Sequence, residues 1–360
     1  MDEKDPLLPE HAEHDNRYGS REHTSGHNTG VLVRSREPPT ITQMLLLVAI
    51  AVLGAYFVAR SWYSSTAIRA STIEIAKPRH HASHITQIEH LPSHLLPSKH
   101  NNRRLLIVGD VHGCPKSLKH LLRKTAYDQV TDHLILAGDM INKGPDTHGV
   151  LSLARKLGAS AVRGNHEDKC LTLRGLQDSG VQITDNSSTD RMIEDAGCAS
   201  DLTKEDVQWL SKAPLILELG NLTSLPHAVS AVVVHAGLVP GIPLEEQDPF
   251  AVMHMRAISR AHHKKHKQKD MGKLVPEEGR NDGEPWYKVW NEEQELLKTK
   301  KKDVDKGMVV VYGHDSKKGL NQRKWSIGLD SGCVNGDRLS GLLIDYQQAE
   351  LHSVRCKDPQ

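Results

Sequence analysis

The sequence predicts an α/β fold in which a β-sandwich is flanked by helices, and three observations lead to this prediction. From residue 104 onward, short runs rich in Val, Ile and Leu alternate with helical stretches. These runs are continuous in their apolar character, which is typical of strands that are buried on both faces. The chain has 360 residues and is 38% hydrophobic, which is enough for a sizeable core.

The predicted elements follow one another in a regular order. A strand in RRLLIVGD precedes a helix in SLKHLLRKTAY, and a strand in HLILAGD precedes a helix that ends at Leu157. Further strands are expected in SAVRGNH, AVVVHAG, GMVVVYGHD and LSGLLIDY. Between them, TKEDVQWLSKAPLIL is expected to contain a helix that caps the domain. We expect this folded domain to span residues 104–352.

Three segments precede the domain. Residues 1–40 are polar without an apolar period, so they predict a disordered tail. Residues 41–60 predict one transmembrane helix, because 41–59 carry no charge and a helix of that length is about 29 Å long. The alternative, a buried core helix, conflicts with the polar sequence on both sides. Residues 61–103 are polar and rich in histidine, and they predict a flexible linker.

The signals for membrane orientation conflict. Basic residues are more numerous after the span than before it, which favours a cytosolic C-terminal domain. Against this, Glu3–Leu8 resembles an acidic dileucine signal, which sorting adaptors would read at Leu7 and Leu8 in the cytosol. Glycosylation sequons begin at Asn186 and Asn221. We therefore expect a single-pass protein of the vacuole membrane, with a cytosolic N-terminal tail and a lumenal C-terminal domain.

Composition excludes several classes of function. The net charge of +1 indicates no partner, and the low aromatic content of 4% argues against a nucleic-acid surface on which bases stack. The five cysteines form no CxxC pair, which excludes a disulfide framework and a thiolate zinc site but leaves room for one bridge.

The predicted strands end in side chains that can bind a cation, and these residues carry the prediction of a site. Ligands of open α/β sheets gather at the carboxyl ends of strands, so we expect the side chains to converge. A lone buried histidine or a single Gly-Asp turn is ordinarily structural. Six Asp, His and Asn side chains at strand ends, each close to a glycine, could hardly all find hydrogen-bond partners without a cation. The predicted metal ligands are Asp110, His112, Asp139, Asn165, His235 and His314.

The ligand types predict the chemistry. Carboxylate, imidazole and amide oxygen without thiolate suit Zn²⁺, Mn²⁺, Fe²⁺ or Co²⁺. Asp139, central in the order, is expected to bridge two such ions, and paired ions activate water and clamp the oxygens of a phosphoryl displacement. Asn165 would contribute a neutral oxygen, and His166 would protonate the leaving oxygen.

These residues resemble the calcineurin-like metallophosphoesterase superfamily. Its motif GDxHG…GD…GNHE…H…GH occurs here in order, across roughly residues 104–345. The resemblance implies that Asp110, His112 and Asp139 hold one ion, and that Asp139, Asn165, His235 and His314 hold the other. It also implies that 104–352 is a catalytic domain with Asp139, Asn165 and His166 at its centre.

The segment GDMINKG departs from the GDYVDRG of the protein phosphatases. Asn142 replaces the carboxylate that orients the acid histidine, and Lys143 replaces an arginine that grips phosphate. The resemblance implies that Arg163 and Lys143 hold the phosphoryl group, with Arg256 as a further candidate. GEPWYKVWN and GLDSGCVNG resemble fungal vacuolar membrane members, among them the zinc-dependent endopolyphosphatase, which favours Zn²⁺ and inorganic polyphosphate.

Three alternatives stay open. A Ser/Thr protein phosphatase or a dinucleoside polyphosphate hydrolase would use the same metal core, and a non-catalytic membrane adaptor would keep only the fold. Polyphosphate fits because its P–O–P bond has a good leaving group, so the loss of the orienting carboxylate is tolerable. The basic runs at 260–269 and 298–302 could guide the chain, although such runs are usually solvated.

Overall fold

A computed structural model describes residues 53–54, 85–180, 190–225, 230–260, 273–299 and 307–356. The chain divides into a unit of residues 1–69 and a unit of residues 70–360. Of the first unit only Leu53 and Gly54 are described, so the predicted tail and almost all of the predicted span at 41–60 lie outside the described residues. Among the helices that are described, none has both the length and the apolar character that a bilayer crossing requires.

The first sheet of the second unit has five strands in the order β14-β13-β2-β3-β4. β2, β3 and β4 are parallel, and β13 joins β2 in antiparallel register, with Gly341 opposite Val108. The strands are Arg104–Val108 (β2), Asp132–Leu136 (β3), Ser160–Ala161 (β4), Arg338–Ile344 (β13) and Ala349–Arg355 (β14). The carboxyl ends of β2, β3 and β4 therefore meet at one edge.

The second sheet has six strands in the order β1-β5-β6-β10-β12-β11. β10 runs parallel to both β6 and β12, so the carboxyl ends of these strands also share an edge. The strands are Ile88–His90 (β1), Ile216–Gly220 (β5), Ser230–Val234 (β6), Met308–Tyr312 (β10), Asn321–Gln322 (β11) and Ser326–Gly328 (β12).

The alternation of side chains along β2 and β3 explains why β2 is apolar from Leu105 onward and β3 from Leu134 onward. Leu105, Ile107 and Ile135 point into the core that contains the residues of β6 and β10. Leu106 and Leu134 point the other way, into a separate core beneath the helices. Both faces are buried, so each residue of these runs is apolar. The predicted sandwich is confirmed.

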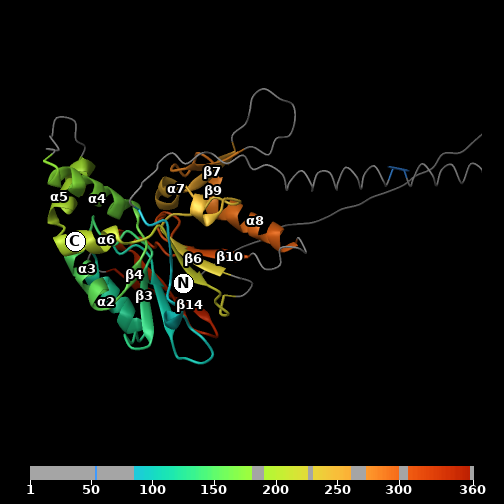
Figure 1. The fold of residues 1–360 in the computed structure, drawn as a ribbon, viewed down its shortest axis with the longest axis horizontal. Helices are drawn as coiled ribbons and strands as arrows, with labels where there is room; N and C mark the ends of the chain where they lie inside the picture. Colours follow the sequence, from blue (N-terminus) through green and yellow to red (C-terminus); the bar gives the residue numbers. More distant parts are fainter. Residues whose placement is uncertain are drawn as a thin grey trace, which may run out of the picture. The chain divides into compact units, whose positions relative to one another are not determined.

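Helices cover both sides of the sandwich, as Figure 1 shows: α2, α3 and α6 lie beside β3 and β4, and α7 and α8 lie near β6 and β10. α5 packs along α4, and α2 packs on β13 and β14. The helices are Pro115–Lys124 (α2), Thr147–Lys156 (α3), Asn165–Asp178 (α4), Asp190–Asp201 (α5), Lys204–Ser211 (α6), Pro249–His254 (α7) and Trp286–Thr299 (α8). Short 3₁₀ turns occur at Ser93–Leu95, Leu244–Glu246 and Cys333–Asn335.

A third, small sheet was not predicted. It consists of Ala257–Arg260 (β7), Leu274–Glu277 (β8) and Glu284–Pro285 (β9), in the order β8-β7-β9. Its strands are short, and two of them contain proline, which weakens a strand signal in sequence. Most of the predicted basic loop at 260–269 lies outside the described residues.

Two further findings refine the predicted organisation. β1 lies inside the predicted linker 61–103, where it pairs with β5 and is followed by the buried Leu91. The folded domain therefore begins before residue 104, since a three-residue strand flanked by histidines gives almost no apolar signal. Cys333 and Cys356 form a disulfide, the one bridge for which the cysteine pattern left room.

Candidate metal centre

Five of the residues at the predicted site have left-handed backbone conformations. Among the described non-glycine residues, positive φ occurs at His112, Asp139, Asn142, Lys143 and His314, and otherwise only at Ala126. Each such residue costs on the order of 1–3 kcal/mol, and strain of this kind concentrates at functional sites. Gly138 also has positive φ, and a Cβ there would lie 2.6 Å from His235 Nδ1. These turns aim the side chains inward.

Asp139, which follows β3, lies between two groups of ligands. Its Oδ1 lies 3.3 Å from His235 Nε2, and its Oδ2 lies 3.5 Å from His112 Nε2. The carboxylate is 2% exposed. One residue therefore belongs to two candidate cation clusters, one with His112 and one with His235 and His314. The shared position of Asp139 that the sequence predicted is what the geometry shows.

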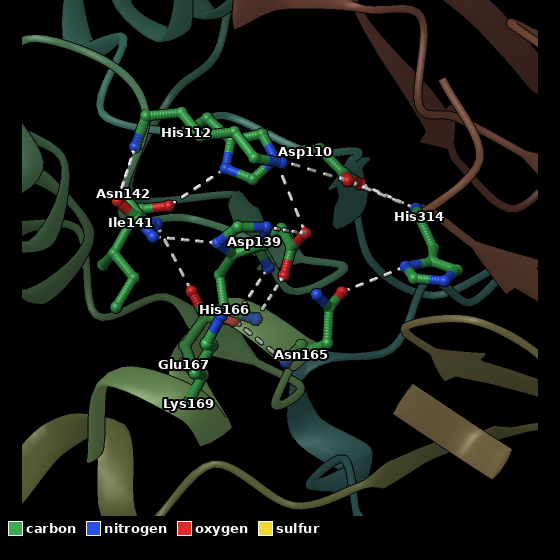
Figure 2. A network of polar contacts seen from close by, with 12 residues as sticks. Asp110, His112, Asp139, Ile141, Asn142, Asn165, His166, Glu167, Lys169 and His314 are labelled. Atoms are coloured by element: carbon green, nitrogen blue, oxygen red, sulfur yellow. Dashed lines mark hydrogen bonds and ion pairs between the residues drawn. The ribbon is translucent and has the colours of Figure 1, made fainter. Parts of the chain in front are cut away.

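The second cluster brings together the ends of β6 and β10 and the start of α4. Asn165 Oδ1 lies 2.9 Å from His235 Nε2 and 3.0 Å from His314 Nδ1. The two imidazole nitrogens are themselves 3.1 Å apart. Figure 2 shows Asn165 facing His314 beneath Asp139.

Three histidines at the site, at positions 112, 235 and 314, each have one ring nitrogen that faces the cluster and one that faces away from it. The hydrogen bond of the nitrogen that faces away determines the tautomer. His112 Nδ1 lies 3.0 Å from the Ile141 carbonyl oxygen, and His235 Nδ1 lies 2.9 Å from that of Ala137. His314 Nε2 lies 3.0 Å from the carbonyl oxygen of His254. A carbonyl oxygen accepts only, so these nitrogens carry the hydrogen and the inner nitrogens present lone pairs. Lone pairs that face one another this closely fit a cation between them.

In the first cluster, His166 also lies close to His112 and Asp139. His166 Nδ1 lies 3.0 Å from Asn142 Nδ2, which donates to it. His166 Nε2 therefore carries the hydrogen in the neutral ring and is a donor rather than a ligand. Asp110 supplies the carboxylate instead, with its Oδ2 3.9 Å from His112 Nε2 and both oxygens accepting from the His314 amide.

The pKa values of His112 and His314 are lowered, whereas the pKa of Asp110 is raised. Burial lowers the pKa of His112 to about 3, and Lys143 adds to this, so the imidazole is neutral. Burial also lowers the pKa of His314. Burial raises the pKa of Asp110, as do the charges of Asp330 and Asp139. A second buried carboxylate beside Asp110 favours a site that a cation completes.

Glu167 connects two loops of the site through hydrogen bonds to their backbone amides. One of its oxygens accepts the amide hydrogens of Asp139 and Gly164, at 2.8 and 2.9 Å. The other accepts those of Met140 and Ile141. Burial and the charge of Asp139 raise the pKa of Glu167 to about 7, while the amide donors oppose this rise. The side chain ties the turn after β3 to the start of α4.

Asn142, which replaces the aspartate of the protein-phosphatase motif, is hydrogen-bonded to a buried carboxylate. Asn142 Nδ2 donates to Asp195 Oδ1 at 2.6 Å as well as to His166. Asp195, on α5, is 3% exposed and pairs with Lys169 of α4. An aspartate at position 142 would face the carboxylate of Asp195 directly. The amide avoids this repulsion and still holds the ring of His166.

The three predicted phosphate-binding residues differ in their placement. Lys143 Nζ lies 3.2 Å from His112 Nε2, at the centre itself. Arg256 follows the turn after α7, and its Nη1 donates to the Glu278 carbonyl oxygen at 3.3 Å. Its Nε is buried and has no hydrogen-bond partner among the described residues, and its charge lowers the pKa of His314. Arg163 is 6% exposed and contacts Asp168 and the Ser211 carbonyl oxygen rather than the ligand cluster.

Sequence reasoning missed three carboxylates of this site: Glu167, Asp195 and Asp330. Glu167 lies inside the GNHE motif, and Asp330 lies inside GLDSG, so both stood in segments already noted. Asp195 lies in a helix with no neighbouring motif, and no local signal marks it. Its role depends on the packing of α5 on α4, which includes a Gln177–Ser200 hydrogen bond.

The residues present fit a pair of divalent ions. Asp110, His112 and Asp139 would hold one ion, and Asp139, Asn165, His235 and His314 the other; such ions supply Lewis acidity and an activated water. Lys143 Nζ lies beside them, 3.2 Å from His112 Nε2, and the charge of Arg256 acts on His314. The chain also directs His166 Nε2–H toward the centre, 3.9 Å from Asp139 Oδ2.

Known proteins are similar to this chain in sequence. A model of the calcineurin-like phosphoesterase family matches residues 103–332. Serine/threonine-protein phosphatase 1 of Salmonella typhimurium is 43% identical over 83 residues, which cover 23% of this chain and 38% of that protein. The symmetrical bis(5'-nucleosyl)-tetraphosphatase of Nitrosospira multiformis is 26% identical over 275 residues, covering 66% of this chain and 91% of that protein.

A solved structure adds to this comparison. The crystal structure of a candidate diadenosine tetraphosphatase covers 74% of this chain and 97% of its own, with a TM-score of 0.54 and 31% identity. The resemblance to fungal endopolyphosphatases stays a prediction. The family match spans more than half of the chain and includes all the metal-ligand positions. The chain therefore belongs to the calcineurin-like phosphoesterase family of hydrolases.

Proposed function

We propose that this chain hydrolyses phosphoanhydride bonds of linear polyphosphate, cutting within the chain as an endopolyphosphatase. The observation that carries the reaction class is the sharing of Asp139 by two clusters of lone-pair ligands. A paired-ion centre of this kind suits an in-line phosphoryl displacement. Zn²⁺ is the proposed ion for both positions.

The choice of an anhydride substrate rests on the surroundings of His166. Its Nδ1 accepts from an amide, so no carboxylate pairs with that nitrogen, and its Nε2 lies 3.9 Å from Asp139 Oδ2. Burial lowers the pKa of His166, which also opposes a charged ring. A phosphoanhydride has a good leaving group and asks less of the acid than an alkyl ester does. Lys143 and Arg256 would bind the oxygens of the phosphoryl group under attack, and Arg163 stays a candidate for this role.

Hydrolysis of dinucleoside tetraphosphates is the second candidate. It is favoured by the 91% coverage of a relative named as a symmetrical bis(5'-nucleosyl)-tetraphosphatase. Both substrates contain the same P–O–P linkage, so the centre described above suits either one. They differ in what flanks the linkage: further phosphates in one case and nucleosides in the other.

A panel of substrates separates the candidates. The full chain, loaded in turn with Zn²⁺, Mn²⁺ and Co²⁺, is given long-chain polyphosphate, diadenosine tetraphosphate and a phosphoserine peptide, with His166→Ala as the control for contaminating enzymes. We expect the highest kcat/KM for polyphosphate, with products of intermediate chain length. A higher value for the dinucleotide would establish the second candidate, and a higher value for the peptide would contradict both.

We also propose that the chain acts at the vacuole membrane, with its single span at 41–60 and its catalytic domain in the lumen. The support is the uncharged stretch at 41–59 and the dileucine signal at Leu7 and Leu8. Replacing both leucines by alanine should divert a fluorescent fusion from the vacuole. Unchanged trafficking would remove the support of this signal.

A further inference from the structure

A cavity of about 500 Å³ opens beside α2, outside the metal-ligand cluster. It lies where the loop after β2 passes into α2, next to the loop that leads into α3. Its lining includes Lys116, Ser117, Lys119, Arg123, Asp146 and Arg355. The lining is thus strongly basic, with one acidic residue.

The cations of this cavity come from two elements and lack acidic partners. Lys116, Lys119 and Arg123 recur at the spacing that places side chains on one face of a helix. Arg355 comes from the end of β14. Across the described ranges, none of these four forms an ion pair. Asp146 caps α3 by accepting the Gly149 amide hydrogen at 2.7 Å, and its single charge is outnumbered by the four cations.

Ser117 supplies a neutral donor on the floor of the cavity. The residue is only 8% exposed, and within the described part of the chain its hydroxyl forms no hydrogen bond. Its oxygen is not among the buried polar atoms that lack a partner, so the small exposed part of the residue includes the hydroxyl at the cavity lining. The hydroxyl is therefore available to a ligand that accepts hydrogen bonds.

The amide groups of the first turn of α2 add to this. No side chain caps this end of the helix, and no acidic residue stands in its first turn. The N–H groups at the start of a helix are unsatisfied by the helix itself and carry partial positive charge. Those of Lys116 and Ser117 belong to this turn and lie at the cavity lining.

The cavity and the metal centre are built on the same two loops. Cys114 and Pro115 line the cavity, and only Gly113 separates them from His112 in the loop after β2. Asp146 lies three residues after Lys143, and its amide donates to the Gly113 carbonyl oxygen at 3.0 Å. The same two loops therefore carry the metal ligands on one side and this basic cavity on the other.

We propose that this cavity is a second phosphate-binding site, in which Ser117 and the α2 amides bind phosphate oxygens and Lys116, Lys119, Arg123 and Arg355 neutralise the charge. The phosphate can come from two sources: the distal part of a polyphosphate substrate, which rests on the proposed function, or free orthophosphate, which does not. The chemistry of recognition is the same in both.

The experiment uses the metal-loaded full chain and a methylene-bridged analogue of tripolyphosphate, which cannot be cleaved. Calorimetry compares the wild type with Lys119→Glu/Arg123→Glu and with Ser117→Ala. The matched control is Lys212→Glu, a charge reversal at an exposed lysine at the end of α6. We expect the double variant to lose one class of binding sites, Ser117→Ala to bind several-fold more weakly at that class, and the control to bind as the wild type does.

Kinetic arms then separate the two sources. If distal substrate phosphates occupy the cavity, the double variant raises KM for long polyphosphate about tenfold and leaves KM for 4-nitrophenyl phosphate unchanged. If free orthophosphate occupies it, KM is unchanged and a noncompetitive effect of orthophosphate on turnover is lost in the double variant. Equal binding by the wild type and the double variant, or equal weakening in Lys212→Glu, would overturn the proposal. Because the calorimetry needs no turnover, it remains decisive even for a chain that does not hydrolyse polyphosphate.

Discussion

At the scale of single residues, the site depends on a chain of hydrogen bonds that begins outside it. Lys169 pairs with Asp195, Asp195 accepts from Asn142, and Asn142 donates to His166. The final donation leaves the hydrogen of the neutral imidazole on Nε2, which faces the centre. Asp195 is thus a positioning residue: it holds the amide of Asn142 in the orientation that His166 requires.

Replacing Asp195 by alanine should reduce turnover in a way that depends on the leaving group. Without Asp195, Asn142 can rotate and present its oxygen to His166 Nδ1, which moves the hydrogen away from Nε2. The Nε2–H group of the neutral ring stabilises the departing oxygen as a hydrogen-bond donor, and loss of one such donor costs roughly 10²–10³-fold in other enzymes, so we expect a loss of about tenfold or more in kcat for phenyl phosphate. The loss should be much smaller for 4-nitrophenyl phosphate, whose leaving group needs little protonation.

The control for this variant is Ser200→Ala, on the same helix. Ser200 bonds Gln177 and the Ala196 carbonyl oxygen, so its loss perturbs the α4–α5 packing without touching Asn142. Asp195→Asn, which retains an oxygen that can accept from Asn142, should recover part of the activity. An equal loss for both substrates in Asp195→Ala would show that Asp195 acts only on packing.

At the scale of elements, capping residues determine where helices start near the site. Thr203 and Asp206 form a reciprocal capping box at the start of α6, with bonds of 3.0 and 3.1 Å between side chain and amide. Asp206 also pairs with Arg155 of α3 and with His148. The carboxylate is almost fully buried, so these partners are needed to hold its charge.

Removing this carboxylate should lower stability in a pH-dependent way. Burial raises the pKa of Asp206, but the hydrogen bonds from Arg155 and Thr203 lower it by a larger amount. The pKa in the folded state therefore lies below its ordinary value of 3.8. The contribution is therefore present above pH 3.8 and is lost as the pH falls through the lower, folded-state pKa. Asp206→Ala should lower the free energy of unfolding by about 2 kcal/mol at pH 7. Urea unfolding at pH 7 and pH 2.5 measures this, and an unchanged difference at the lower pH would contradict it.

The disulfide ties two elements of the first sheet. Cys333 starts the 3₁₀ turn that precedes β13, and Cys356 follows β14 directly. A bridge of this loop length ordinarily stabilises by about 2–4 kcal/mol. We expect a thiol reductant to lower the melting temperature of the wild type and to leave that of Cys333→Ser/Cys356→Ser unchanged. An equal decrease in both proteins would show that the bridge contributes nothing.

At the scale of the whole molecule, the sequence predicts those parts that follow from short-range signals. Continuous apolar runs marked the buried strands, and the Gly-Asp and Gly-Asn-His ends of these strands marked Asp110, Asp139 and Asn165. A two-layer sandwich then requires the strand ends to meet. The ligand set could be predicted because each member sits beside its own strand.

Other features depend on packing between distant segments, and no local pattern predicts them. β1 pairs with β5, and Ile88 and Leu91 pack on a core that is formed by distant strands. Asp195 reaches Asn142 across 53 positions, through the packing of α5 on α4. The cavity beside α2 combines a basic helix face with Arg355, which β14 brings back from the end of the domain.

The proposed paired centre depends on Asp139 holding two cations at once, and metal content tests this most directly. Inductively coupled plasma mass spectrometry of the full chain, purified after saturation with Zn²⁺ and removal of free ions, should give two ions per chain for the wild type and for His166→Ala. Asp139→Asn should retain fewer than one, with an unchanged circular dichroism spectrum. Two ions per chain in Asp139→Asn, or only one in the wild type, would contradict the shared centre.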